Sequence, residues 1–152
     1  MKILSHLDRR GEASMVDVSN KPVMRRQAIA RGEIRLQQST LKLIQGRRMA
    51  KGNVLGTARL AGIMAAKKTG ELIPLCHPLP LAHCEVQFEI PATRDRIVIT
   101  TSAKIAAQTG IEMEALTAVT LAALTIYDMC KAADKTMRIT NIRLVSKTKS
   151  EP

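Results

Sequence analysis

The hydrophobic residues of this chain follow two periods, one typical of strands and the other typical of helices. Over residues 82–90, apolar and polar side chains alternate without interruption, as in a strand with one buried face. A turn over residues 91–95 and a second apolar run over residues 96–102 complete a predicted hairpin. Residues 15–19 and 28–36 also alternate, and they predict two strands nearer the N-terminus.

Two helices are predicted before the hairpin. Residues 40–45 form a short helix, for which Ser39 is the expected N-cap and Gly46 the terminator. A longer helix is expected to begin after Asn53 and to end just before Gly70. Its inner stripe consists of small residues, which let another backbone approach closely: Ala58, Ala61, Gly62, Ala65 and Ala66.

A third helix and a final strand follow the hairpin. Thr109 and Glu112 have the spacing of a capping box, and the helix is expected to run on to about residue 133. In the strand predicted over residues 136–146 the apolar positions change phase, which predicts a bulge near residues 140–141. This order of elements favours an α+β sandwich with helices on one face of a mainly antiparallel sheet.

The length of 152 residues suits a single domain. We expect a flexible N-terminal segment over residues 1–14, one α+β domain over residues 15–147 and a short C-terminal tail over residues 148–152. Neither a signal peptide nor an apolar run long enough to cross a membrane is expected. Three cysteines without a regular spacing predict reduced thiols in a cytoplasmic protein.

The charge of the chain predicts an anionic partner. Lys and Arg total 24 against 13 Asp and Glu, which gives a net charge of +11 and a pI near 10.1. Such an excess of positive charge suits nucleic acid or a phosphate-bearing small molecule. With only one Tyr and one Phe in the chain, the aromatic surfaces on which single-stranded bases stack are lacking. The composition therefore favours recognition of phosphate groups over recognition of bases.

Two cysteines and two histidines lie close together in the sequence: Cys76, His77, His83 and Cys84. A zinc site needs such ligands to converge on one ion. His83 and Cys84 are neighbours on a predicted strand, so their side chains leave opposite faces and no metal site is expected. Cys76 and His77 lie in a loop stiffened by three prolines. From the residues alone this loop is either a rigid connector or a ligand-contacting turn.

Charged residues mark both ends of the longest predicted helix. Asp128 and Lys131 share one helix face, where a solvated pair would contribute only about 0.2–0.5 kcal/mol. Apolar neighbours would instead shift both pKa values towards the range needed for proton transfer, and the residues alone leave both roles open. At the other end Glu112 is explained by the capping box, whereas Glu114 has no such local role.

The spacing of these acidic residues constrains any shared site. Glu114 and Asp128 are fourteen residues apart, so they lie about 21 Å from each other along one helix. One small substrate cannot touch both in the same chain. If both residues serve one site, that site must form between two subunits. Lys51 adds a candidate cation just before a predicted helix N-terminus, where anions are favoured.

Long contiguous motifs resemble the MoaC family of cyclic pyranopterin monophosphate synthases, which act in molybdenum cofactor biosynthesis. They cover most of the chain between residues 15 and 147. The motifs read MVDVS at 15–19, KGNVL at 51–55, AGIMAAK at 61–67, LIPLCHPL at 72–79, TGIEMEALTA at 109–118 and AALTIYDMCKA at 122–132.

The resemblance implies a ferredoxin-like α+β fold and a hexamer built as a trimer of dimers, with the active site at the dimer interface. It also implies a lyase that converts 3′,8-cyclo-7,8-dihydroguanosine triphosphate into cyclic pyranopterin monophosphate and releases pyrophosphate. The implied partner is thus a small molecule derived from a nucleoside triphosphate. No cofactor, resident metal, nucleic-acid partner or membrane partner is expected.

The resemblance also assigns roles to individual residues. Asp128, Lys131 and Lys51 match the catalytic acid–base positions of the family. The remaining matches are to substrate-binding positions, of which the basic ones suit the triphosphate: Leu75, Cys76, His77, Glu112, Met113, Glu114, Lys21, Arg26 and Lys67.

Some positions depart from the family pattern. Met24 stands where the family usually has Thr, Asn53 where Asp is common, and Ala107 where Gly is common. Residues 147–152 lack the family's Gly-Gly-Lys-Ser-Gly ending, so the chain is expected to close its site differently if that ending folds over the triphosphate.

Two other functions compete with this interpretation. The positive charge alone is compatible with a non-catalytic module that binds nucleotides or nucleic acid. The cysteines and histidines are compatible with a structural protein stabilised by zinc.

Overall fold

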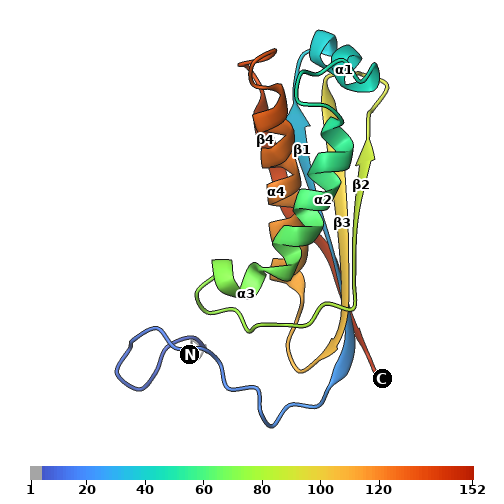
Figure 1. Ribbon diagram of the computed structural model, residues 1–152. Helices are drawn as coiled ribbons and strands as arrows, with labels where there is room; N and C mark the ends of the chain where they lie inside the picture. The colour runs from blue at the N-terminus through green and yellow to red at the C-terminus, as the bar shows by residue number, and fades with distance from the viewer. Residues whose placement is uncertain (1–4) are drawn as a thin grey trace.

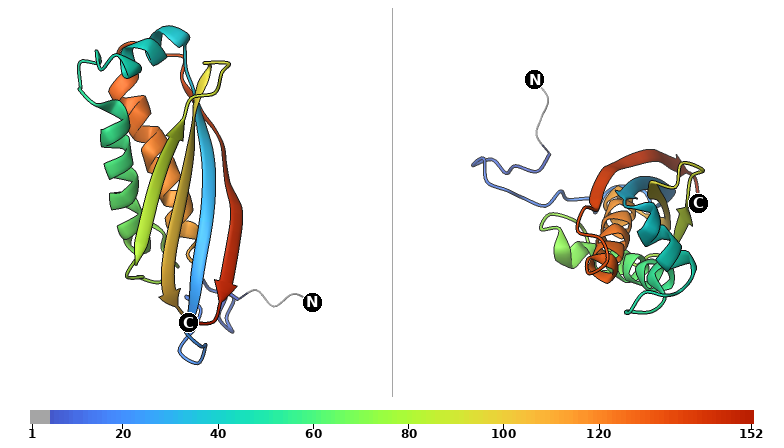
Figure 2. Two further views of the ribbon diagram at one scale, coloured as in Figure 1. Left: turned by 90° about the vertical axis from the view of Figure 1, so that its right-hand side faces the viewer. Right: turned by 90° about the horizontal axis from the view of Figure 1, so that it is seen from above.

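The computed structural model describes residues 5–152. Its helices and strands follow one another in the order β1–α1–α2–α3–β2–β3–α4–β4. The elements are β1 (Met24–Arg35), α1 (Gln38–Gln45), α2 (Val54–Lys67), α3 (Thr69–Leu72), β2 (His83–Glu89), β3 (Arg96–Ala107), α4 (Glu112–Cys130) and β4 (Arg138–Ser150). The four strands form one antiparallel sheet in the order β2-β3-β1-β4. Helices α2 and α4 lie side by side on one face of this sheet (Figures 1 and 2). The predicted α+β sandwich of ferredoxin-like type is confirmed.

The core lies between α4 and the two central strands, β1 and β3. Both strands alternate buried and less buried residues along most of their length, as period-two side-chain geometry requires. On α4 the buried face is rich in alanine, which brings the helix backbone close to its neighbours: Ala115, Ala118, Ala122 and Ala123 are fully buried. Thr101 of β3 donates a hydrogen bond of 2.7 Å to the carbonyl of Ala115. The helix is therefore fixed to the sheet by packing and by a buried polar contact.

Strand β4 contains the predicted bulge and extends beyond the predicted end at residue 146. Glu33 pairs with Thr140 and Arg31 with Arg143, so two β4 residues lie opposite Gly32. One of them, Asn141, has a φ of 59°, a conformation that Asn tolerates better than most residues. Pairing continues as far as Ser150, which places three residues of the expected C-terminal tail within β4.

Three local predictions are wrong. Residues 15–19 form no strand, because residues 15–18 have no regular secondary structure and Ser19 lies in a turn. Helix α1 has Gln37 rather than Ser39 at its N-cap, and Thr109 does not cap α4, whose N-cap is Ile111 without a side-chain hydrogen bond. Asn53, by contrast, caps α2 as predicted by accepting a 3.0 Å hydrogen bond from the Gly56 amide.

The end of α2 differs in detail from the prediction. The helix ends at Lys67, and Gly70 lies inside the short helix α3 instead of ending α2. A Cβ added at Gly70 would lie 2.9 Å from the Cα of Pro78. The absence of a side chain at this glycine therefore lets the proline-rich loop pack against α3.

The N-terminal segment, residues 5–23, extends past the end of the sheet (Figure 1), and part of it lines a cavity together with the beginning of α4. Of the region expected to be flexible, residues 1–4 lie outside the described residues. Residues 7 and 13 pair in an isolated bridge, which closes a small loop ahead of β1.

Helix α4 is long and apolar enough to cross a membrane by length and composition alone, contrary to the sequence expectation. Just over half of its apolar window, 56%, is buried inside the structure. Its apolar character is thus largely accounted for by packing on the sheet and on α2.

We predict that Ile99→Ala destabilises the fold by about 2–5 kcal/mol, because it opens a cavity at a fully buried position of β3. Val98→Ala on the same strand faces the other side of the sheet and should cost clearly less. Urea unfolding at one fixed protein concentration measures both values. Equal losses for the two variants would contradict the assignment of the buried face.

Candidate functional site

The structure divides the predicted site residues into two groups at opposite ends of α4. Its C-terminal end, with Asp128, lies beside α1, while its N-terminal end, with Glu112 and Glu114, lies near α3 and the N-terminal segment (Figure 1). The helix is continuous over its 19 residues, so the two groups remain about 21 Å apart. The separation expected from the sequence is therefore present within one chain.

The first group consists of Lys51, Asp128 and Lys131, which we call the charged triad. Lys131 is the C-cap residue of α4, and its ammonium donates a 2.7 Å hydrogen bond to Asp128 Oδ1. The Lys51 ammonium donates to Asp128 Oδ2 at 2.8 Å and to the Asp128 carbonyl at 3.2 Å. Lys51 reaches Asp128 from the loop between α1 and α2, where Gly52 has a φ of 90° that a side chain would disfavour.

Electrostatic contacts shift the pKa values of Asp128 and Lys131 in the directions that favour their charged forms. Hydrogen bonds from Lys131 and then from Lys51 lower the pKa of Asp128 to about 2. The same contact with Asp128 raises the pKa of Lys131 above its usual value. The three side chains are about half exposed, at 50% for Lys51, 53% for Asp128 and 57% for Lys131, so solvent screening limits their contribution to stability. Their arrangement offers one carboxylate and two ammonium groups to a ligand that approaches from solvent.

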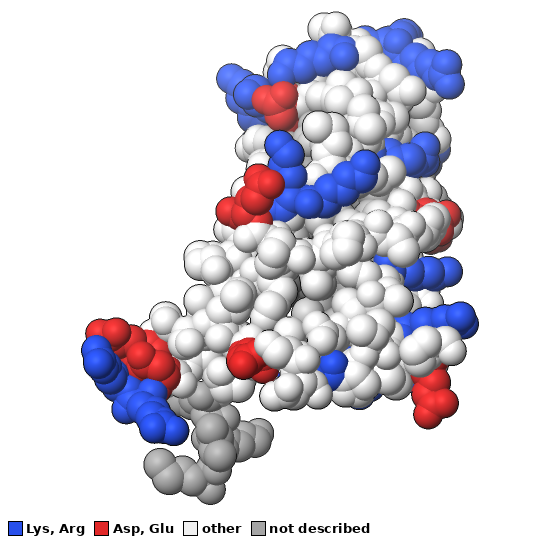
Figure 3. All heavy atoms as spheres, turned by 60° about the horizontal axis from the view of Figure 1, so that its bottom comes forward, with Lys and Arg blue, Asp and Glu red and all other residues white. Residues whose placement is uncertain are grey.

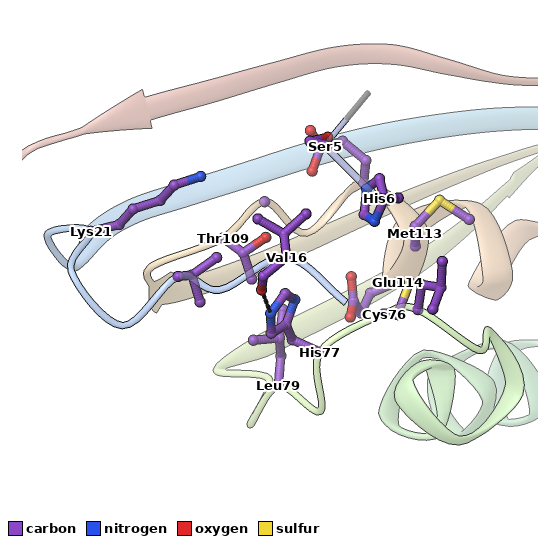
Figure 4. A pocket seen from close by; sticks show the side chains of 14 residues that line it. Ser5, His6, Val16, Lys21, Cys76, His77, Leu79, Thr109, Met113 and Glu114 are labelled. Carbon is purple, nitrogen blue, oxygen red and sulfur yellow. Dashed lines mark hydrogen bonds between the residues drawn. The ribbon is translucent and has the colours of Figure 1, made fainter. Parts of the chain in front are cut away.

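The second group lines a cavity of about 420 Å³ (Figure 4). The proline-rich loop forms one wall, the beginning of α4 a second, and the N-terminal segment a third. The predicted residues that line it are Lys21, Leu75, Cys76, His77, Glu112, Met113 and Glu114.

His77 connects two walls of this cavity. Its Nε2 lies 2.8 Å from the carbonyl oxygen of Val16, a contact drawn as a dashed line in Figure 4. Gln108, the residue after β3, holds the N-terminal segment at a second point by donating a hydrogen bond of 3.3 Å to the carbonyl of Ser19. The Pro-rich loop is therefore not a connector alone, because its histidine holds the N-terminal segment over the cavity.

Glu114 is the buried acid of the cavity, with 3% of its surface exposed. Burial raises its pKa, and the negative charge of Glu112 raises it further. Burial also raises the pKa of the Cys76 thiol, and the nearby Glu114 carboxylate adds to this shift. These two groups thus hold protons more tightly than exposed residues of the same type.

The pKa of Glu112 depends on different neighbours from those of Glu114. Burial alone would raise its pKa, but a 2.9 Å hydrogen bond from Lys147 and the charges of Lys147 and Arg26 hold the pKa below its usual value. Lys147 was not among the residues singled out from the sequence, because the final strand was expected to end at residue 146. The continuation of β4 past this point brings its ammonium to the cavity.

The other two predicted basic residues lie beside the main cavity. Lys67 lines a smaller adjacent depression together with Glu114. The guanidinium of Arg26 donates to the carbonyls of Ala107 and Gln108 at 3.1 and 3.0 Å, so part of its donor capacity is already used. Lys21, Lys67 and Arg26 therefore surround the cavity, although only Lys21 lines it directly.

Within residues 5–152, no three side chains of His, Cys, Asp or Glu gather closely enough to hold a metal ion. The four residues weighed as a zinc set accordingly do not converge. On the face shown in Figure 3, the Lys and Arg side chains are scattered, with uncharged surface between them, and do not form one block.

We predict that NMR titration of the Asp128 carboxyl gives a pKa near 2, and that Lys131→Met and Lys51→Met each raise it towards 3.8. Lys131→Met should have the larger effect, because its hydrogen bond is the strongest influence on Asp128. Because folding lowers this pKa, the stabilisation by the triad is complete above pH 3.8 and is lost as the pH falls through about 2.

Lys135→Met is the control for this titration, since Lys135 is exposed and makes no hydrogen bond to Asp128. A pKa that stays near 2 in both triad variants would show that the two ammonium groups do not contact Asp128 in solution.

Comparison with known proteins identifies the family to which the sequence belongs. The model of the MoaC family matches residues 15–150. A protein of Pelotomaculum thermopropionicum called cyclic pyranopterin monophosphate synthase is 57% identical over 148 residues, which cover 97% of this chain and 87% of that protein. Proteins with the same name from Chloroflexus aggregans and Desulforapulum autotrophicum are 58% and 56% identical, over 95% and 97% of this chain and 87% and 91% of their own lengths. This chain belongs to the MoaC family.

Proposed function

We propose that this protein is a cyclic pyranopterin monophosphate synthase of molybdenum cofactor biosynthesis. Its reaction converts 3′,8-cyclo-7,8-dihydroguanosine triphosphate into cyclic pyranopterin monophosphate and releases pyrophosphate. The observation that carries this proposal is the 57% identity over 97% of the chain to a relative with that name. A cytoplasmic location, and catalysis without a bound cofactor or metal, are parts of the same proposal.

The two groups of residues take separate roles in this proposal. Asp128, Lys131 and Lys51 are the catalytic residues, since they present opposite charges within hydrogen-bonding distance at an exposed position. The cavity of about 420 Å³ binds the substrate through the residues that line it or lie beside it: Lys21, Arg26, Lys67, Leu75, Cys76, His77, Glu112, Met113 and Glu114.

The distance between the groups supports a site shared by two chains. A small substrate cannot bridge about 21 Å, so the charged triad of one protomer must meet the cavity of another. A two-fold interface gives each protomer the same pair of contributions and creates two equivalent sites. We propose such a dimer, assembled further into a hexamer as a trimer of dimers.

The electrostatics of the two groups suit the proposed chemistry. Rebuilding a guanine-derived ring as a pterin requires several proton transfers, for which a site needs some groups that act as acids and others that act as bases. Asp128 is held ionised beside two ammonium donors, whereas burial favours the protonated form of Glu114. The proposed site therefore contains both a charged acid–base set and a carboxyl group whose pKa is raised.

Formation of the cyclic phosphate requires stabilisation of the leaving group. A substrate hydroxyl gives up its proton to a general base as its oxygen forms a new bond to the α-phosphorus, and the bond from that phosphorus to the pyrophosphate oxygen breaks. Negative charge accumulates on the departing oxygens, where positioned cations are most effective. Lys21, Lys67 and Arg26 around the cavity supply such cations.

Purified protein given the cyclic nucleotide should form the pterin product and pyrophosphate, and Asp128→Ala should lower kcat about 10²–10⁴-fold. Asp95→Ala is the matched control, because Asp95 is also an exposed carboxylate paired with basic residues, Arg35 and Arg96, but lies in the connection between β2 and β3. Turnover should persist in that control.

Absence of turnover by the wild type would exclude the proposed reaction, and full turnover by Asp128→Ala would exclude the proposed role of the triad. Salt-dependent duplex binding that is insensitive to Asp128→Ala would instead favour the nucleic-acid module suggested by the net charge of +11.

A mixed oligomer tests whether the site is shared. Asp128→Ala and His77→Ala should each be inactive alone, but co-assembly should restore roughly a quarter of the wild-type activity, because half of randomly paired dimers would hold one intact site of two. The control is co-assembly of Asp128→Ala with Lys131→Ala, in which every site lacks part of the triad. Restoration in the control, or none in the test pair, would contradict a site built from the triad of one chain and the cavity of another.

A further inference from the structure

Asp134 is a buried carboxylate to which the sequence assigned no role. It lies in the turn between α4 and β4, three residues after Lys131, and only 2% of its surface is exposed. An ionised carboxylate at such a position is unfavourable unless its oxygens are well hydrogen-bonded. Asp134 meets this condition through four donors, which come from two segments far apart in the sequence.

Each carboxylate oxygen serves one of these segments. Oδ1 accepts from the amide and the hydroxyl of Thr136, at 2.9 and 2.7 Å, at the start of the following chain. Oδ2 accepts from the amide of Gln37 at 2.9 Å and from the hydroxyl of Thr40 at 3.1 Å. Gln37 and Thr40 belong to the first turn of α1, whose own N-cap residue makes no side-chain cap. Asp134 therefore caps α1 from a distant part of the chain.

The turn that contains Asp134 is continuous with the position of Lys131. The amides of Ala133 and Asp134 both donate to the carbonyl of Cys130, at 2.9 and 3.0 Å. These bonds extend the end of α4 through Lys131 as far as Asp134. Any shift of Asp134 is thus transmitted to the backbone from which the Lys131 side chain projects.

On the other side, α1 leads directly to Lys51. The chain leaves α1 at Gln45, and the amide of Arg48 donates back to the carbonyl of Leu43 at 2.9 Å. The amide of Gly52 donates to the carbonyl of Met49 at 3.0 Å. The loop that carries Lys51 is therefore built on the end of the helix that Asp134 caps.

The triad depends on this connection because it has little other support. Among the described residues, the Lys51 ammonium hydrogen-bonds only to Asp128, and all three side chains are about half exposed. Long, solvated lysine side chains keep a fixed geometry only when their backbones are held at the right separation. That separation is the distance between the end of α4 and the loop after α1.

We propose that Asp134 is a positioning residue for the charged triad: by joining the end of α4 to the beginning of α1, it holds Lys131 and Lys51 on either side of Asp128. Its catalytic consequence rests on the proposed function, whereas its effect on the triad does not require a substrate.

The test is Asp134→Asn, which keeps the size of the side chain but replaces one acceptor oxygen with an NH₂ group that cannot accept. One of the two segments then loses its acceptor, and the lysines should move away from Asp128. The pKa of Asp128, measured by NMR, should rise from about 2 towards 3.8. Removal of a nearby negative charge by itself would lower that pKa, so the sign of the shift separates repositioning from a simple charge effect.

Two threonines provide matched variants in case Asp134→Asn does not fold. Thr40 and Thr69 are both 1% exposed, but Thr40 donates to Asp134 while Thr69, the first residue of α3, donates to the carbonyls of Ala65 and Ala66 in the preceding helix α2. Thr40→Val should raise the pKa of Asp128, although less than Asp134→Asn. Thr69→Val should leave it unchanged even if it destabilises the protein by a similar amount.

With substrate, Asp134→Asn should lower kcat on the order of tenfold and change KM little, because the triad is displaced and the cavity is not. An unchanged or lowered Asp128 pKa in folded Asp134→Asn or Thr40→Val would overturn the proposal, as would equal shifts in Thr40→Val and Thr69→Val. A raised Asp128 pKa in Asp134→Asn, together with no turnover by the wild type, would support the positioning role and refute the proposed function.

Discussion

The close packing of α4 against the sheet and α2 is the constraint on which the rest of the structure depends. Alanines on the inner face of α4 and Gly62 on α2 let the two helices approach until a Cβ at Gly62 would lie 3.0 Å from the carbonyl of Ala118. Contacts this close leave no freedom for the helix to slide or bend. The residues at the two ends of α4 are therefore held at a fixed distance from each other.

This separation places acidic groups in two different environments. Asp128 is exposed beside two ammonium groups, which lower its pKa, whereas Glu114 is buried beside another carboxylate, which raises its pKa. Carboxyl groups whose proton affinities are pushed apart are a common basis for assigning acid and base roles. One helix thus supplies both kinds of group, at positions too far apart for one small substrate to contact both within a single chain.

Long-range polar contacts hold together the segments that carry the residues of the candidate site. His77 holds the N-terminal segment at Val16, Lys147 reaches Glu112 from the extended β4, and Asp134 joins α1 to the end of α4. Each contact joins segments at least 35 residues apart. Such contacts determine side-chain geometry at the candidate site more directly than the apolar core does, because they act on exposed loops.

The sequence by itself determined the features that arise from local chemistry. Alternation predicted β1 and the β2–β3 hairpin, the change of phase located the bulge at residues 140–141, and the amide oxygen of Asn53 predicted its cap on α2. The spacing of acidic residues on one helix also fixed the separation of the two groups.

Only the tertiary structure decided what depends on distant partners. Residues 15–19 alternate like a strand but have no neighbouring strand with which to pair, and Ser39 leaves the capping of α1 to Asp134, which lies far along the chain. Lys147 becomes part of the candidate site because β1 offers a partner to the last residues of β4. Periodicity reports which face of a segment is apolar, but hydrogen bonds between segments form only where folding brings a donor and an acceptor together.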